Sequence, residues 1–195
     1  LDKNLLNNVK MEFKKGDIVG VMGESGTGKS TLLKLIPKFR ETDGIYINDI
    51  PISEIKNKDY LRKVSYYSQN TPIITDTLYN NLNFGRKKVS KAIYEAMPFL
   101  TKFINLDEMI VENGANLSGG DKQRIALSRY FTEDADIVIL DEPTSSLDKE
   151  TEEELMKEIL KDTKDKIVFI ISHNKEIMKY CSHLVEIKNK TATVL

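Results

Sequence analysis

The sequence predicts an α/β fold built on a mainly parallel sheet. Three short segments, Ile18–Met22, Ile137–Leu140 and Ile167–Ile171, are apolar without alternation, as strands covered on both faces are. Amphipathic stretches alternate with the apolar runs, and this order favours parallel strands connected by helices. Polar residues follow the carboxyl end of each run, where open parallel sheets bind ligands, so we expect three distant segments to meet at one edge.

The first part of the chain predicts further elements. A glycine-rich loop follows Ile18–Met22 and leads into Ser30–Ile36, which reads as a helix. Gly44–Asp49 and Val64–Gln69 are rich in Ile, Val and Tyr and read as strands, with a helical stretch between them. Phe13 also reads as part of a strand.

The middle of the chain has a different pattern. Residues 71–133 hold few strand-like runs, and Ser90–Phe99 and Lys122–Phe131 have helical spacing. These residues therefore predict a helical insert within the α/β fold. The tail, His183–Leu195, reads as a short hairpin that turns at Asn189-Lys190.

Composition excludes several classes of protein. The 195 residues suffice for one domain with a substantial core, and the net charge of −1 gives no electrostatic footprint for DNA, RNA or an anionic membrane. Cys181 is the single cysteine, which excludes a disulfide framework or zinc cluster and favours a reducing compartment. Every apolar run is too short to span a membrane, and none reads as a signal peptide. The start at Leu1 suggests a piece of a longer chain.

The segment Gly23–Ser30, GESGTGKS, matches the phosphate-binding loop pattern GxxxxGK[ST], also called Walker A. Its glycines bring backbone N–H groups against phosphate oxygens, Lys29 supplies a charge for the outer phosphates, and the Ser30 hydroxyl is a ligand for Mg²⁺. A random chain of this length shows the pattern roughly 1% of the time, so a plain glycine-rich turn is the weaker interpretation. The predicted nucleotide-binding residues here are Gly23, Glu24, Ser25, Gly26, Thr27, Gly28, Lys29, Ser30 and Thr31.

An acidic pair, Asp141-Glu142, follows the second apolar run. A carboxylate at this strand end can hold Mg²⁺ opposite the Ser30 hydroxyl. Glu142 is then placed to orient or deprotonate an attacking water. On its own, such a pair is more often a solvated loop or a helix cap, and only the phosphate-binding loop reverses that interpretation.

A second loop-to-helix junction lies at Leu117–Arg124, LSGGDKQR. Ser118, with Asp121 three residues later, resembles a capping box at a helix start. A serine and two glycines ahead of a helix also form a second anion site from backbone N–H groups and a hydroxyl.

The stretch LSGGDKQR resembles the signature motif of the ABC ATPases, and companion motifs occur in that family's order over essentially the whole chain. They are the phosphate-binding loop Gly23–Ser30, the Q-loop glutamine Gln69, the Mg²⁺ strand and glutamate Ile137–Glu142, the D-loop Ser145–Asp148 and the switch histidine His173. The resemblance implies a single ABC ATPase domain over 1–195 with a P-loop NTPase fold. Residues 1–70 and 134–195 would form a RecA-like core with a small antiparallel β region, and 71–133 a helical subdomain that carries the signature.

The resemblance also implies a composite site for ATP and Mg²⁺, formed when two such domains pack head to tail as a homodimer. Its catalytic residues would be Glu142, His173, Gln69 and Lys29, and its metal ligands Ser30, Gln69 and Asp141. The partner's ATP would be closed over in trans by Ser118, Gly119 and Gly120, with Asp148 at the dimer junction. Without the resemblance, His173 is an ordinary loop histidine.

Two segments resemble the exporter branch of the family. Asn70–Leu82 is similar to the segment after the exporters' glutamine, and Val111–Gly114 to their cross-talk loop, although the latter alone is also a plain turn. The resemblance implies transmembrane partner domains at the cytoplasmic face of the cell membrane. In this family membrane helices choose the transported substrate, which the sequence therefore leaves open.

Two departures from the family stand out. An adenine-stacking aromatic residue is absent at the expected distance before the loop, because Phe13 lies too close to it, so this residue is expected upstream of Leu1. Asp121 replaces the usual Gln or Glu, which we expect to matter little because the position stays polar.

Two other functions remain as alternatives. A soluble ABC ATPase acting on nucleic acid or ribosomes would carry long coiled coils or two tandem cassettes, and the sequence has neither. A nucleotide-gated binding module without catalysis is disfavoured by Glu142 and His173.

Overall fold

The computed structural model describes residues 10–68, 72–84, 88–95, 97, 100, 105–112, 114–132, 134–161 and 163–195. The chain divides into two compact units. The core unit comprises Leu1–Tyr66, Asp134–Glu142 and Asp162–Leu195, and the helical unit comprises Tyr67–Glu133 and Pro143–Lys161. The predicted domain boundaries at 70 and 134 stay a prediction.

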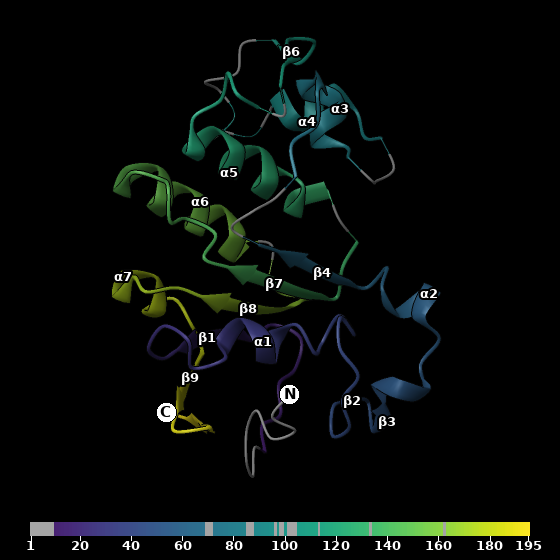
Figure 1. Cartoon of the computed structure of the whole chain (residues 1–195), viewed down its shortest axis with the longest axis vertical. Helices are drawn as coiled ribbons and strands as arrows, with labels where there is room; N and C mark the ends of the chain where they lie inside the picture. Colours follow the sequence, from purple (N-terminus) through teal and green to yellow (C-terminus); the bar gives the residue numbers. More distant parts are fainter. Residues whose placement is uncertain are drawn as a thin grey trace. The chain divides into compact units, whose positions relative to one another are not determined.

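The core unit is organised around a six-stranded sheet in the order β10-β9-β1-β8-β7-β4 (Figure 1). Its strands are β1 (Ile18–Met22), β4 (Val64–Tyr67), β7 (Ile137–Asp141), β8 (Ile167–Ile171), β9 (His183–Lys188) and β10 (Thr191–Val194). Strands β9, β1, β8 and β7 run parallel, and β10 returns antiparallel to β9. The three apolar runs predicted as core strands are thus neighbours in one sheet, and they are buried along almost their whole length.

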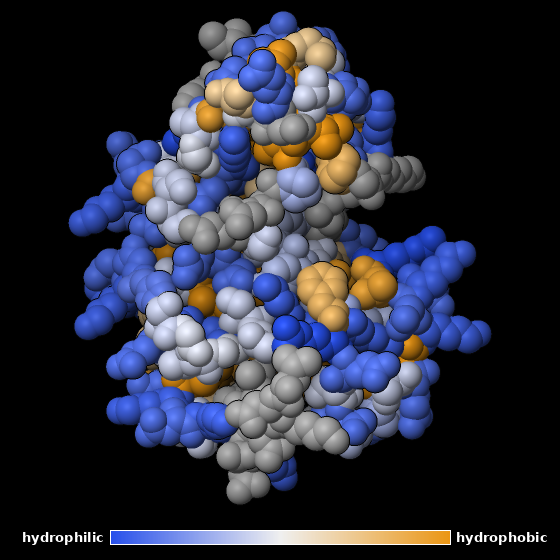
Figure 2. Space-filling view, in the orientation of Figure 1, coloured by the Kyte–Doolittle hydropathy of each residue, from blue (hydrophilic) through white to orange (hydrophobic). Residues whose placement is uncertain are grey.

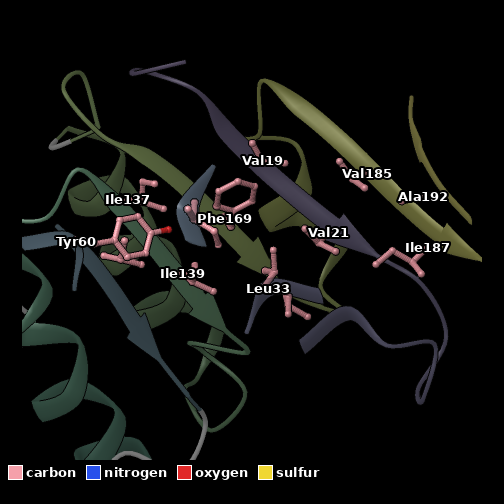
Figure 3. Packing of buried hydrophobic residues seen from close by; sticks show 13 residues of the cluster. Val19, Val21, Leu33, Tyr60, Ile137, Ile139, Phe169, Val185, Ile187 and Ala192 are labelled. Carbon is pink, nitrogen blue, oxygen red and sulfur yellow. The ribbon is translucent and has the colours of Figure 1, made fainter. Parts of the chain in front are cut away.

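One face of this sheet carries the main hydrophobic cluster of the core unit (Figure 3). Val19, Ile139 and Phe169 come from adjacent strands and meet Leu33 of α1 (Lys29–Leu33), and all four are at most 8% exposed. Burying each such side chain contributes about 1.5–3 kcal/mol. The cluster therefore fixes α1 against the sheet and, with it, the loop between β1 and α1.

On the opposite face, Gly20 of β1 lies against Met178 and Cys181, which belong to α7 (Lys175–Met178) and the turn after it. A Cβ at Gly20 would come within 2.6 Å of the Met178 sulfur. Burial raises the pKa of the Cys181 thiol to about 11. This thiol is thus neutral at physiological pH and packs as a small apolar group.

Two predictions for the core unit were wrong. Gly44–Asp49 is not one strand: β2 (Tyr46–Ile47) and β3 (Ile50–Pro51) form an antiparallel hairpin, because Asn48 and Asp49 adopt positive φ values of 49° and 65°. Phe13 lies outside the strands and packs edge-on against Phe169, with ring centroids 5.5 Å apart.

Other expectations for this unit are confirmed. The stretch between β3 and β4 is helical, with a 3-10 turn at Ile52–Glu54 and α2 at Asn57–Tyr60. The tail is a hairpin of β9 and β10, and its turn residues Asn189 and Lys190 have positive φ values of 51° and 58°.

The helical unit contains four α-helices among its described residues: α3 (Leu78–Leu82), α4 (Lys91–Glu95), α5 (Gly119–Ser128) and α6 (Lys149–Lys161). A two-stranded antiparallel sheet joins β5 (Asp76–Thr77) to β6 (Met109–Ile110). The helices predicted at Ser90–Phe99 and Lys122–Phe131 correspond to α4 and α5, although Phe99 lies outside the described residues.

Large apolar side chains of this unit are fully enclosed, among them Leu82, Ile125 and Leu155. The amide of Asn81, also fully buried, donates to the Ile74 and Thr77 carbonyls at 2.9 and 3.1 Å. Buried amides are tolerated when their hydrogen bonds are satisfied in this way.

The predicted fold class is confirmed: the chain has an α/β fold with a mainly parallel sheet, small antiparallel sheets and a helical part. In the described part of the chain, every helix is too short or too polar to cross a membrane. Figure 2 shows hydrophilic side chains over most of the visible face, with a few hydrophobic residues between them.

Candidate functional site

The predicted phosphate-binding loop connects β1 to α1 within the core unit. Gly28 precedes the helix as its N-cap, with a left-handed φ of 96°. A glycine has no side chain to cap the first N–H groups, so these are left for an anion. This arrangement is compatible with the predicted phosphate-binding role, which stays a prediction.

The ammonium group of Lys29 folds back over this loop. Its Nζ donates to the carbonyl oxygens of Gly23 and Glu24, both at 2.8 Å, and the residue is only 7% exposed. Thr27 Oγ1 also donates to the Glu24 carbonyl, at 2.9 Å. A positive charge is thus fixed above the loop backbone, where outer phosphates would be met.

A hydroxyl and a carboxylate from distant parts of the sequence meet beside the loop. Ser30 Oγ donates to Asp141 Oδ1 at 3.1 Å, and Asp141 lies at the carboxyl end of β7. Mg²⁺ prefers oxygen ligands and usually takes one or two from the protein and the rest from phosphates and water. This pair fits that donor set, although the described residues contain no cluster of three or more His, Cys, Asp and Glu.

The other oxygen of this carboxylate has a partner that the sequence analysis missed. Tyr66 OH donates to Asp141 Oδ2 at 2.5 Å. Burial, the hydrogen bond and the Asp141 charge together raise the pKa of Tyr66 far above its usual value, so the phenol keeps its proton. Both carboxylate oxygens are thereby oriented by hydroxyl groups.

Glu142 and His173 lie side by side at the same sheet edge. His173 Nε2 is 3.4 Å from Glu142 Oε1. Glu142 directly follows β7, and His173 lies two residues after the end of β8, the adjacent parallel strand. Glu142 adopts a positive φ of 52°, and its N–H donates to the Ile171 carbonyl at 2.9 Å. Non-glycine residues with this backbone conformation are uncommon and concentrate at functional sites.

A second cluster lies within the helical unit at the start of α5. Ser118 caps the helix: its Oγ accepts from the Asp121 N–H at 3.2 Å, and its own N–H donates to Asp121 Oδ2 at 3.1 Å. A pocket of about 510 Å³ opens here, which we call the serine–glycine pocket. It is lined by Ser118, Gly119, Gly120, Arg124, Ser146, Leu147 and Asp148.

Two side chains of α5 tie this pocket together. The Gln123 amide donates to Ser145 Oγ and accepts from the Ser146 N–H, both at 2.9 Å. Arg124 donates to Thr151 Oγ1 at 2.8 Å and lies 3.7 Å from Asp148. Hydrogen bonds from Thr151 hold the pKa of Asp148 below its ordinary value. The motifs marked Ser118–Gly120 and Asp148 in the sequence, whereas no motif assigned a role to Gln123 or Arg124, which connect these two segments.

Most of the predicted site residues lie in these two clusters, each within one unit. Gln69, predicted both as a catalytic residue and as a metal ligand, lies outside the described residues, so its role stays a prediction. The predicted cross-talk loop is described only in part: Val111 is exposed, and Asn113 is outside the described residues.

An α/β fold with a phosphate-binding-loop pattern between its first strand and the following helix is typical of nucleotide-binding domains. The model of the ABC transporter family matches residues 6–145, and the chain therefore belongs to this family, as its ATP-binding ATPase domain.

Relatives agree with this assignment. A probable ABC transporter ATP-binding/permease protein of Haemophilus influenzae is 33% identical over 201 residues, covering 96% of this chain and 36% of that protein. ATP-dependent lipid A-core flippase 2 of Colwellia psychrerythraea is 35% identical over 193 residues, covering 93% of this chain and 33% of that protein. The solved structure of a bacterial Atm1-family ABC exporter with ATP bound superimposes with a TM-score of 0.90 at 25% identity, covering 98% of this chain and 36% of that one. The chain thus spans about a third of these proteins.

Proposed function

We propose that this domain hydrolyses ATP with Mg²⁺ and, as a head-to-tail homodimer, powers export of a substrate across a membrane. The observation that carries the proposal is the convergence of Ser30, Asp141, Glu142 and His173 at one sheet edge beside the phosphate-binding loop. These side chains supply a metal site, a base and a histidine within one unit, which is the set that phosphoryl transfer to water needs.

Each residue has a chemical role in this proposal. Lys29 and the loop N–H groups bind the β- and γ-phosphates, and the hydroxyl of Ser30 and the carboxylate of Asp141 hold Mg²⁺. The metal neutralises charge that develops on the phosphate oxygens. Glu142 accepts a proton from the attacking water, and His173 contacts the γ-phosphate. Gln69 is proposed to join the metal ligands.

The serine–glycine pocket is proposed to close over ATP held by a second copy of the chain. Backbone N–H groups at the start of α5 and the Ser118 hydroxyl are donors suited to phosphate oxygens. Asp148, which lines the same pocket, would then lie at the dimer junction. Two such pockets and two phosphate-binding loops complete two ATP sites in a symmetric dimer.

Export is supported by the names of the relatives, which include an ATP-binding/permease protein and lipid A-core flippases. We propose that the domain acts at the cytoplasmic face of a membrane and that transmembrane domains are its partners. Action on nucleic acid or ribosomes has no comparable support, since the net charge of −1 gives no attraction for phosphate backbones.

The test is the solution mass of Glu142→Gln with and without Mg-ATP, measured by light scattering after size exclusion. Loss of the base leaves ATP intact, so we expect a monomer without ATP and a dimer with it. Glu142→Gln combined with Lys29→Ala is the matched control and should stay monomeric. ATP hydrolysis undiminished in Glu142→Gln, or an ATP-independent mass, would contradict the proposal.

A further inference from the structure

The hydroxyl proton of Ser118 is committed to a carboxylate. Ser118 Oγ lies 2.7 Å from Asp121 Oδ2, and because an ionised carboxylate only accepts, the serine must be the donor. A serine hydroxyl has one proton, so this bond uses its whole donor capacity. Asp121 is 6% exposed, which keeps water from competing for the contact.

The charges around the serine–glycine pocket also favour this closed arrangement. The guanidinium of Arg124 lies 3.4 Å from Asp121 Oδ1 and 3.7 Å from Asp148 Oδ2, and it donates to Thr151 Oγ1. The cation that lines the pocket is therefore shared between two carboxylates. An incoming phosphate meets an arginine that is already paired with two carboxylates and a serine that is already donating.

We propose that Asp121 is a positioning residue that holds the serine–glycine pocket in a state of low affinity for phosphate. To donate to a phosphate oxygen, Ser118 must first give up its bond to the Asp121 carboxylate, and the carboxylate then lies beside a second anion. This inference rests on the proposed function, in which the pocket closes over the partner's ATP. It makes Asp121 a residue that sets how tightly the dimer closes.

Glutamine at this position removes the restraint and keeps the helix cap. Gln and Glu both serve as the third helical residue of a capping box. A glutamine amide can donate to Ser118 Oγ, which leaves the hydroxyl proton for phosphate, whereas a glutamate still only accepts. The two variants Asp121→Gln and Asp121→Glu therefore differ from each other in charge and donor capacity, whereas their side chains have the same length.

The experiment measures the dimer dissociation constant in Mg-ATP for both variants in the Glu142→Gln background, by light scattering over a dilution series. Hydrogen bonds to ionised groups are roughly twice as strong as neutral ones, so we expect Asp121→Gln to tighten each site about fivefold and the two-site dimer about 25-fold. Asp121→Glu should dimerise as the parent does. Damage to the helix would weaken the dimer, so a tighter one cannot arise from a merely structural role.

The Ser118→Ala variant separates the effect of the hydroxyl proton on dimerisation from the effect of charge repulsion between residue 121 and the phosphate. With alanine at this position, the advantage of the Gln variant over the Glu variant should shrink to the part that the glutamate charge alone causes, because no hydroxyl proton remains to be released. An advantage of undiminished size there, or equal dimerisation with Ser118 present, would overturn the inference while leaving the proposed function intact. A parent that never dimerises with ATP would overturn both. Without ATP, the unfolding midpoints of the two variants should differ by less than about 3 °C.

Discussion

Replacing Gly23 with alanine tests the geometry of the phosphate-binding loop without touching a charged group. Gly23 has a φ of 151°, a conformation that L side chains rarely adopt. An added Cβ would lie 2.5 Å from the Ile187 carbonyl oxygen and 2.9 Å from Thr27 Oγ1. Ile187 is in β9, which is paired on both sides, so its carbonyl cannot retreat without disturbing the sheet.

Two costs add in Gly23→Ala. Positive φ costs an alanine about 1–2 kcal/mol, and forcing an atom into an occupied space costs at least about 1 kcal/mol more. We therefore expect the free energy of unfolding to fall by about 3 kcal/mol, or about 6–12 °C in midpoint. Gly44→Ala is the matched control: its φ is also positive, 89°, but no heavy atom lies within 4 Å of the added Cβ. Only the strain of about 1–2 kcal/mol applies there.

The assay is urea unfolding followed by circular dichroism without nucleotide, because the chain has no tryptophan for fluorescence. Calorimetric titration with Mg-ATP then shows whether the substitution also weakens the affinity for the nucleotide. If Gly23→Ala loses no more stability than Gly44→Ala and binds ATP normally, the loop does not have the packing described here.

Three further predictions concern single side chains. Tyr66→Phe removes the donor to Asp141 Oδ2. The free energy of unfolding in urea should fall by about 1–2 kcal/mol, and the Mg²⁺ concentration for half-maximal ATPase activity should rise. An unchanged Mg²⁺ dependence would contradict the orienting role of Tyr66. Burial raises the pKa of Tyr60 to about 12, so the unfolded chain ionises first and stability should fall as pH rises from about 10 toward 12, more steeply in the parent than in Tyr60→Phe. Leu155 of α6 is fully buried, and Leu155→Ala should lower the free energy of unfolding by about 3 kcal/mol in the same assay. A loss below about 1 kcal/mol would mean that the surrounding side chains fill the cavity left by the leucine.

The strands were predictable where the sequence pattern fits a strand and no other element. Ile137–Leu140 and Ile167–Ile171 are short, apolar and bounded by polar residues, and both are central strands in the sheet. Gly44–Asp49 misled because Ile45, Tyr46 and Ile47 have high β-propensity, while the turn preference of Asn48-Asp49 decides where the strand ends. Phe13 failed for a related reason: propensity says nothing of whether a neighbouring strand is there to pair with it.

The site was predictable in the residues that motifs mark and not in those that orient them. Ser30 and Asp141 could be paired from their motifs, and the structure brings them within 3.1 Å. Tyr66 could not, because a tyrosine in a strand usually serves the core, and only the adjacency of β4 and β7 in the sheet gives it a role. Gln123 was missed likewise, since a helical glutamine is ordinarily a solvated residue.

The hydrogen bonds of Gln123 join two segments of the chain. Its amide bonds both Ser145 and Ser146, so α5 is linked to the segment that supplies Ser146, Leu147 and Asp148 to the serine–glycine pocket. Ser145 is three residues after Glu142, and three residues of extended chain span at most about 10 Å. The proposed base and Ser145, which is bonded to Gln123, can therefore never be separated by more than this short length of chain.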